Sequence, residues 1–206
     1  MNSAAAPAVR ERESHREKLL SAALDCLREK GYARTTARDL VAASGTNLAS
    51  IGYHFGSKEA LLNEAIAEGF RAWTAEVERA MFREESASAL ERFGRSLEAM
   101  LDRFEELRPL LTSFVEALPQ AARSPELREQ LAQAYRECRE SGARMVARAL
   151  GEQGVSMTKE QSETLSSVGM AISDGIMLQW LVDPEAAPSS QQVLEAVAVA
   201  LPALPP

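Results

Sequence analysis

The feature that most constrains this chain is the run TTARDLVAASGTNLASIGYHFGSKEALL, residues 35–62. Thr36 is a good N-cap, and Asp39 three residues later can answer the exposed amides of the first helical turn. Gly45 favours the end of that helix, because glycine adopts a positive φ at little cost. Asn47 can then cap a second short helix. Two short helices joined by a turn that contains glycine predict a helix-turn-helix, whose second helix enters the DNA major groove.

Length and composition favour a helical protein. The chain has 206 residues, which is enough to bury a sizeable core. Ala, Leu, Glu and Arg dominate, and no alternating β-branched run of strand length occurs. We therefore expect an all-α fold of about nine helices.

The sequence favours a cytoplasmic location without membrane contact. No apolar stretch approaches the ~20 residues of a membrane span, and residues 1–14 lack the apolar core of a signal peptide. Cys26 and Cys138 lie far apart in predicted helices. We interpret them as reduced, buried thiols rather than as a redox pair.

The net charge of −7 divides unevenly along the chain. Residues 1–62 carry nine Lys and Arg against seven Asp and Glu, which gives +2, whereas the remaining 144 residues carry 14 against 23, which gives −9. This asymmetry suits a DNA-contacting head on an acidic body that phosphate would repel.

Residues 18–62 are similar to the N-terminal domain of the TetR family of bacterial transcriptional repressors. The matching features are an apolar stripe in the first helix, Gly31-Tyr32, Thr35-Thr36, Arg38-Asp39-Leu40, Gly45 and the run Tyr53-His54-Phe55-Gly56-Ser57-Lys58-Glu59-Ala60-Leu61. Two positions depart from the pattern: Thr46 replaces the usual apolar residue after the turn, and Gly52 replaces a larger or polar one. The bases that the helix-turn-helix prefers therefore cannot be inferred from the resemblance.

The resemblance implies a division of labour within the helix-turn-helix. Thr36, Tyr53 and Lys58 are expected to contact backbone phosphate and to position the head. The side chains expected to face base edges are those of Asn47, Leu48, Ala49, Ser50 and Gly52. We place His54 in the helix bundle, since no second ligand lies at metal-binding spacing, and we expect no metal and no cofactor.

The domain organisation follows from the resemblance and the helix signals. We expect an arm at 1–13, a helix-turn-helix domain at 14–62, a helical effector-binding and dimerisation domain at 63–201 and a tail at 202–206, with both ends disordered. The expected helices beyond the helix-turn-helix span about 14–30, 57–81, 87–107, 108–116, 125–153, 159–182 and 192–201.

Near the C-terminus the segment 168–180 is apolar nearly all round, so it must be covered on every side. The resemblance implies that this helix and the last one form a four-helix interface with a second subunit, and the alternative is that they fill the core of a monomer. The residues expected at the interface are Gly169, Ala171, Ile172, Ser173, Gly175, Ile176, Val193 and Val197.

The helical body also contains candidates for a ligand cavity. Flexible Met and flat aromatic side chains suit lipophilic ligands, although the same residues can simply fill a core. These candidates are Met100, Phe104, Leu111, Phe114, Tyr135, Met145, Met170, Met177 and Trp180. Glu116 could meet a cationic ligand or lie at the surface.

These features predict a homodimeric transcriptional regulator, a repressor released from a palindromic double-stranded operator by a small, largely apolar effector. No nucleophile elbow, phosphate-binding glycine loop or metal-spaced cluster occurs in the sequence, so we expect no enzyme. One alternative is a helical small-molecule-binding or enzymatic domain in which the helix-turn-helix is only scaffold. A DNA-binding regulator without a ligand is a further alternative.

Overall fold

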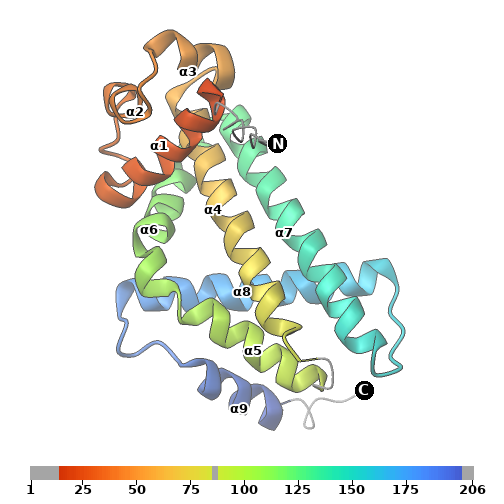
Figure 1. Ribbon diagram of the computed structural model, residues 1–206. Coiled ribbons are helices and arrows are strands. Elements are labelled where there is room, and N and C mark those ends of the chain that lie inside the picture. Colours follow the sequence, from red (N-terminus) through yellow and green to blue (C-terminus); the bar gives the residue numbers. More distant parts are fainter. Residues whose placement is uncertain (1–13, 85–87, 201–206) are drawn as a thin grey trace, which may run out of the picture.

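A computed structural model describes residues 14–84 and 88–200 of the chain, and all regular structure in that part is helical, which confirms the all-α prediction (Figure 1). The expected arm at 1–13 and tail at 202–206 lie outside the described residues. The helices are α1 His15–Lys30, α2 Ala37–Ser44, α3 Leu48–Phe55, α4 Lys58–Met81, α5 Ala89–Leu101, α6 Phe104–Ala121, α7 Pro125–Gly151, α8 Lys159–Val182 and α9 Ser190–Ala200.

The helices form a small head and a larger body. Helices α1–α3 make the head at the top of Figure 1, and the long α4 and α7 run from the head down through the body. Helix α8 crosses the base against α7, and α9 lies against α5. The N-terminal turn of α4 packs in the head, so one continuous helix joins the two parts.

Side-chain capping explains where many of these helices begin. Ser14 caps α1 through a reciprocal bond with Glu17, and Thr158 and Gln161 repeat the arrangement at α8. Gly31 ends α1 with a φ of 76°, a conformation that favours glycine.

The expected single helix over 87–107 is wrong. The chain interrupts at Asp102 and Arg103, and α6 restarts at Phe104, whose ring is buried. Pro109, expected at the start of a helix, lies inside α6, as does Pro119. Arg103 pairs with Glu76 of α4 at 2.5 Å, which holds this junction against the long helix.

The head and the body share one hydrophobic core. The cluster of buried side chains runs without interruption from Leu19 of α1 through Leu61 and Ile66 of α4 to Met177 of α8. The expected boundary at 62/63 therefore falls inside a continuous helix and inside a continuous core, and a shift of α4 reaches the head through packed side chains.

Helix α8 is unusually apolar for its exposure. In the described part of the chain it is the one helix long and apolar enough, by length and composition, to span a membrane, and only 17% of that window is buried. The expectation that no apolar stretch approaches the length of a membrane span is therefore wrong for α8. Such a helix is weak grounds for a membrane span, because a helix that packs in a soluble protein passes the same test.

Candidate nucleic-acid interface and effector region

The helix-turn-helix forms as its sequence predicts. The Thr36 hydroxyl caps α2 by accepting from the backbone N–H of Asp39, and the Asp39 carboxylate accepts from the backbone N–H of Thr36. Gly45 ends α2 in the left-handed conformation at a φ of 65°. Asn47 caps α3, its Oδ1 accepting from the backbone N–H of Ser50 at 3.0 Å. At the other end of α3 the backbone N–H of Gly56 donates to the Gly52 carbonyl, so both ends are capped, and Ile51 is buried beneath the helix.

The outer face of α3 presents most of the residues expected to meet base edges. Leu48 is 56% exposed, and Asn47, Ala49 and Gly52 are also exposed. Ser50 is the exception, because it is only 8% exposed and its hydroxyl donates to Asn47 Oδ1 at 3.3 Å. The expectation that Ser50 faces base edges is wrong, since its hydroxyl helps to hold the cap.

The three expected phosphate contacts differ in their availability. Tyr53 is 86% exposed. The Lys58 ammonium donates to the Thr35 carbonyl at 3.0 Å and lies 3.2 Å from Glu59 Oε1, which leaves one of its three N–H donors. The Thr36 hydroxyl donates its single proton to Asp39 Oδ2 at 2.6 Å, and its contact with phosphate stays a prediction.

Asp39 is held by a second partner on α1. The Lys30 ammonium lies 2.5 Å from its Oδ1. The hydrogen bond from Lys30 lowers the pKa of Asp39 well below its ordinary value, and the hydrogen bonds from the Thr36 hydroxyl and backbone N–H lower it further. The pair ties the start of α2 to the end of α1 and keeps the carboxylate charged where the head must approach DNA.

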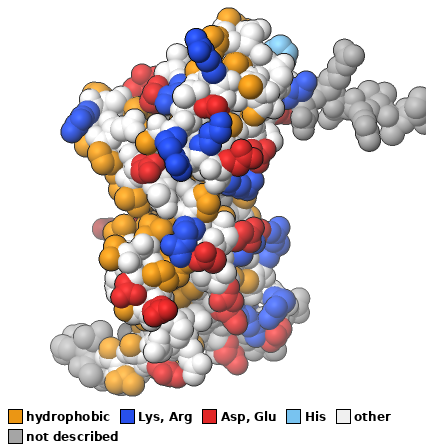
Figure 2. Space-filling model, turned by 90° about the vertical axis from the view of Figure 1, so that its left-hand side faces the viewer, with side chains coloured by type: hydrophobic (Ala, Val, Ile, Leu, Met, Phe, Trp, Pro, Cys, Tyr) orange, Lys and Arg blue, Asp and Glu red, His pale blue; other side chains and the backbone are white. Residues whose placement is uncertain are grey.

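The head carries exposed cations that the sequence reasoning did not assign to DNA. Arg34 and Arg38 are exposed at the turn before α2 and in its first turn. In the view of Figure 2, Lys and Arg side chains (blue) lie across the upper part of the molecule, where the head is. Their position beside the Thr36 cap is the signal that could have identified them as phosphate-facing residues.

His54 is half-buried at the end of α3 rather than deep in the bundle. Its ring lies edge-on to Tyr53 at a centroid distance of 4.9 Å and to Phe55 at 6.3 Å. Within residues 14–84 and 88–200, no group of three His, Cys, Asp or Glu side chains could hold a metal ion.

Most of the expected cavity residues pack together in the body. Phe104 lies 5.3 Å from Trp180 and 5.9 Å from Trp73 between ring centroids, and Phe114 lies 6.1 Å from Tyr135. Met100, Leu111 and Met177 are buried in the same core, and Met170 is half-buried. Met145 is an incorrect member of the set, because it is buried in a separate cluster with Met81 and Ala149.

A polar pair lies beside this aromatic cluster. The Tyr135 hydroxyl donates to Asp174 Oδ2 at 2.8 Å, between α7 and α8. Burial raises the pKa of Asp174, and burial followed by the charge of Asp174 raises the pKa of Tyr135. Asp174 was not predicted from the sequence because it lies in the segment 168–180, which is otherwise nearly all apolar.

Glu116, expected either at a cationic ligand or at the surface, is half-buried and contacts the head. Its Oε2 accepts from the backbone N–H of Ala33 at 3.1 Å. Glu116 lies on α6 and Ala33 on the turn after α1. The contact is a direct link between the body and the head.

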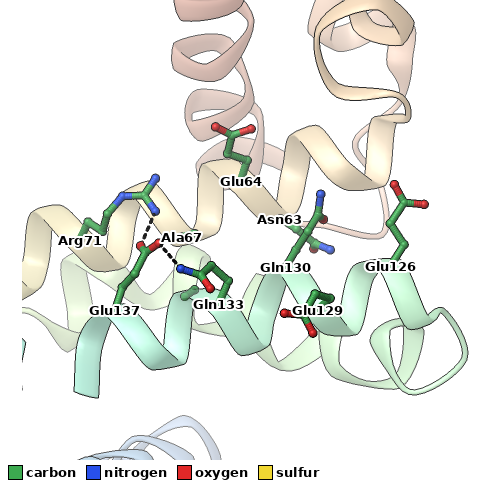
Figure 3. A pocket seen from close by; sticks show the side chains of 10 residues that line it. Asn63, Glu64, Ala67, Arg71, Glu126, Glu129, Gln130, Gln133 and Glu137 are labelled. Atoms are coloured by element: carbon green, nitrogen blue, oxygen red, sulfur yellow. Dashed lines mark hydrogen bonds and ion pairs between the residues drawn. The ribbon is translucent and has the colours of Figure 1, made fainter. Parts of the chain in front are cut away.

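A hollow of about 560 Å³ lies between α4 and α7, and none of the expected cavity residues lines it. It lies close to the head, near the N-terminal parts of both helices (Figure 3). The side chains around it are largely polar: Asn63, Glu64, Ala67, Arg71, Glu126, Glu129, Gln130, Gln133, Ala134 and Glu137.

The expected dimer face is largely open on α8. A Cβ added at Gly169 or Gly175 would meet nothing within 4 Å, and Ile172 is 36% exposed. Ala171 is exposed and Ser173 half-buried. Ile176 is 6% exposed, so assigning it to the interface is wrong: it belongs to the protomer core.

On α9, Val193 and Val197 are half-buried, and Val193 packs against the protomer core. Part of the expected α9 face is therefore covered within the protomer. The exposed side of α9 includes Val199, which is 78% exposed.

Comparison with known proteins identifies the family of the two parts of the chain. Residues 19–65 match the profile of bacterial regulatory proteins of the tetR family, and residues 89–205 match the C-terminal profile of BetI-type transcriptional repressors. None of the curated proteins compared with the chain matches it.

Three solved structures share the fold. A protein from Pseudomonas aeruginosa PAO1 described as a transcriptional regulator is 23% identical, with 95% of each chain covered and a TM-score of 0.68. One from Rhodococcus sp. RHA1 is 20% identical, with 92% of this chain and 95% of that one covered and a TM-score of 0.72. A third, from Saccharomonospora viridis in complex with choline, is 24% identical, with 89% and 93% covered and a TM-score of 0.62.

The capped helix-turn-helix, its exposed α3 and the attached helical body define a DNA-binding transcriptional regulator. The two profiles together cover most of the chain. The chain belongs to the tetR family of bacterial regulatory proteins.

Proposed function

We propose that this regulator is a homodimeric repressor that binds a palindromic operator through α3 and is released by a small-molecule effector. The observation that carries the proposal is the outer face of α3. Its caps are satisfied within the head, whereas Leu48, Gly52 and Tyr53 stay exposed. A short helix fixed at both ends with an unused outer face suits insertion into the major groove.

The surface of α8 supports the homodimer. Val168 is 50% exposed and Leu178 46% exposed, and the open glycines lie between them. Contiguous exposed apolar surface favours association, and small residues allow two helices to approach closely. A two-fold interface would also present two heads to two operator half-sites.

An effector is supported by the contacts that join body and head and by the hollow between α4 and α7. The aromatic rings around Phe104 pack against one another, so they support the expected largely apolar ligand less than the sequence did. The structural relative in complex with choline supports a small organic effector for this fold.

The test is binding of the purified protein to DNA from its own upstream region, measured by gel shift over a range of salt concentrations. We expect tight binding to one palindromic site and a steep loss of affinity as salt rises. In vitro transcription from the same fragment should fall when the protein is added. Binding that ignores sequence would refute an operator-specific regulator, and a rise in transcription would refute the repressor role.

A further inference from the structure

The residues that line the hollow between α4 and α7 carry an excess of negative charge, and the hollow is called the groove below. Four carboxylates line it, those of Glu64, Glu126, Glu129 and Glu137, against the single guanidinium of Arg71. In Figure 3 Glu126 and Gln130 reach from α7 toward α4 and lie near Asn63, whereas the Glu64 side chain points away from α7. Its volume of about 560 Å³ is in the range of small-molecule sites.

Two buried polar atoms in the groove lack partners. Asn63 is 2% exposed, and its Nδ2 donates to no acceptor within the described part of the chain. The Oε1 of Gln130, which also lines the groove, is buried and accepts from no donor there. A buried polar atom without a partner is costly, so a donor and an acceptor left open at one groove point to a ligand that satisfies both.

The lining carboxylates are not equally available. Glu64 pairs with Arg16, Glu129 with Arg136, and Glu137 with Arg71 at 3.1 Å. Among residues 14–84 and 88–200, Glu126 is exposed and forms no hydrogen bond or ion pair. Glu126 and Gln130 are four residues apart on α7, so their side chains lie on the same helix face.

We propose that this groove binds a small aliphatic amine as the effector, its ammonium between Glu126 and Gln130 Oε1 and an acceptor atom on Asn63 Nδ2. A primary ammonium supplies a positive charge for the free carboxylate and N–H donors for the amide oxygen. A hydroxyl or carbonyl at the other end accepts from Asn63. The inference rests on the proposed function, because it names the effector of the same regulator.

The groove is placed to signal to the head. Asn63 Oδ1 accepts from the buried hydroxyl of Tyr32 at 3.1 Å, so the amide that meets the ligand also holds the end of α1. Glu64 pairs with Arg16, whose guanidinium lies 5.2 Å from the centroid of the Phe55 ring on α3. An amine whose acceptor atom pulls on Asn63 weakens the Tyr32 attachment of the head, and the Arg16 attachment lies on the next residue of α4. The ligand thereby favours one arrangement of the head over another.

The test uses 4-aminobutan-1-ol, which carries an ammonium and a hydroxyl, titrated into the full-length protein by calorimetry at fixed ionic strength. Tetramethylammonium, with the charge but no N–H, and butane-1,4-diol, with no charge, are the comparison compounds. We expect saturable binding of the amino alcohol alone. Equal binding of tetramethylammonium would overturn the proposal, because it would show general attraction to acidic surface, and so would the absence of saturable amine binding.

Two variants locate the site. Glu126→Gln and Gln130→Leu should each weaken amine binding about tenfold, since each removes one direct contact. Glu140→Gln makes the same charge change at an exposed position of α7 outside the groove and should leave amine binding within about twofold. Equal losses in Glu126→Gln and Glu140→Gln would overturn the assignment.

Operator binding in the same buffer separates the two proposals. If the protein binds its operator and the amine does not release it, the effector site is wrong while the regulator stands. If the protein fails to bind any operator although the amine binds in the groove, the proposed function is wrong.

Discussion

Replacing Gly175 with leucine tests the proposed dimer without disturbing the protomer. A Cβ at this position would meet nothing within 4 Å, and Gly175 lies inside α8 at an ordinary helical φ. Leucine has a higher helix propensity than glycine by about 0.8 kcal/mol, so the isolated protomer should be at least as stable as before. Any loss must then come from a surface that the protomer alone does not cover.

The expected loss follows from the two-fold symmetry. Inserting a larger side chain into a packed contact costs about 1–3 kcal/mol. A two-fold interface carries the substitution twice, so the dimer should weaken by about 2–6 kcal/mol, on the order of thirtyfold to ten-thousandfold in its dissociation constant. Because both heads are needed for a palindromic operator, affinity for the operator should fall with the dimer.

Sedimentation equilibrium measures the dimer, and thermal unfolding of wild type and variant at a dilution where both are monomeric measures the protomer, because association adds to the apparent stability. Gly151→Leu is the matched control, since Gly151 ends α7 and a Cβ there also meets nothing within 4 Å. It should leave both quantities unchanged. A Gly175→Leu protein that dimerises as tightly as the wild type would refute the assignment of this face.

Three further predictions concern the head. Asn47→Ala should lower the free energy of unfolding by about 1 kcal/mol and weaken operator binding, because α3 loses its cap; thermal melts and gel shifts report both. Lys58→Gln should weaken binding to all DNA sequences alike and reduce the slope of log affinity against log salt by about 0.9, whereas an altered operator preference would contradict the phosphate assignment. Burial raises the pKa of Tyr32 to about 12, so wild-type stability should fall by about 3 kcal/mol as pH rises from about 10 through 12. In urea titrations the fall in Tyr32→Phe should be smaller by that amount, with the contribution of Tyr135 remaining, and the variant should be less stable at neutral pH by about 1–3 kcal/mol because Asn63 Oδ1 loses its donor.

The parts of the fold that the sequence predicted are those decided by local chemistry. Thr36, Gly45 and Asn47 cap or end the two short helices as expected, and Thr158 starts α8 at the expected place. A cap depends on a side chain and the backbone within three residues of it, so the residue type is nearly sufficient information. The match of residues 18–62 to a family pattern added the order of these elements.

The errors arose where distant segments decide the outcome. Ser50 has the chemistry of a base reader, but its hydroxyl bonds inward to the Asn47 cap. Ile176 sits on a helix that is apolar all round, so only packing decides which side the protomer covers. Met145 shares its residue type with the core methionines and yet packs in another cluster. Periodicity places residues on helix faces, but it does not say which helix will cover each face.

The route from effector to DNA follows from where the head is attached. Tyr32 and Arg16 bind two successive residues of α4, Asn63 and Glu64, while the backbone of Ala33 binds Glu116 of α6. The head is therefore held by two helices of the body rather than by one. If α4 and α6 moved together, the head would follow as a rigid unit, and the spacing of two heads would change only through the dimer interface. If a ligand between α4 and α7 displaces α4 relative to α6, the two attachments pull α1 in different directions and the head must rotate within its own protomer.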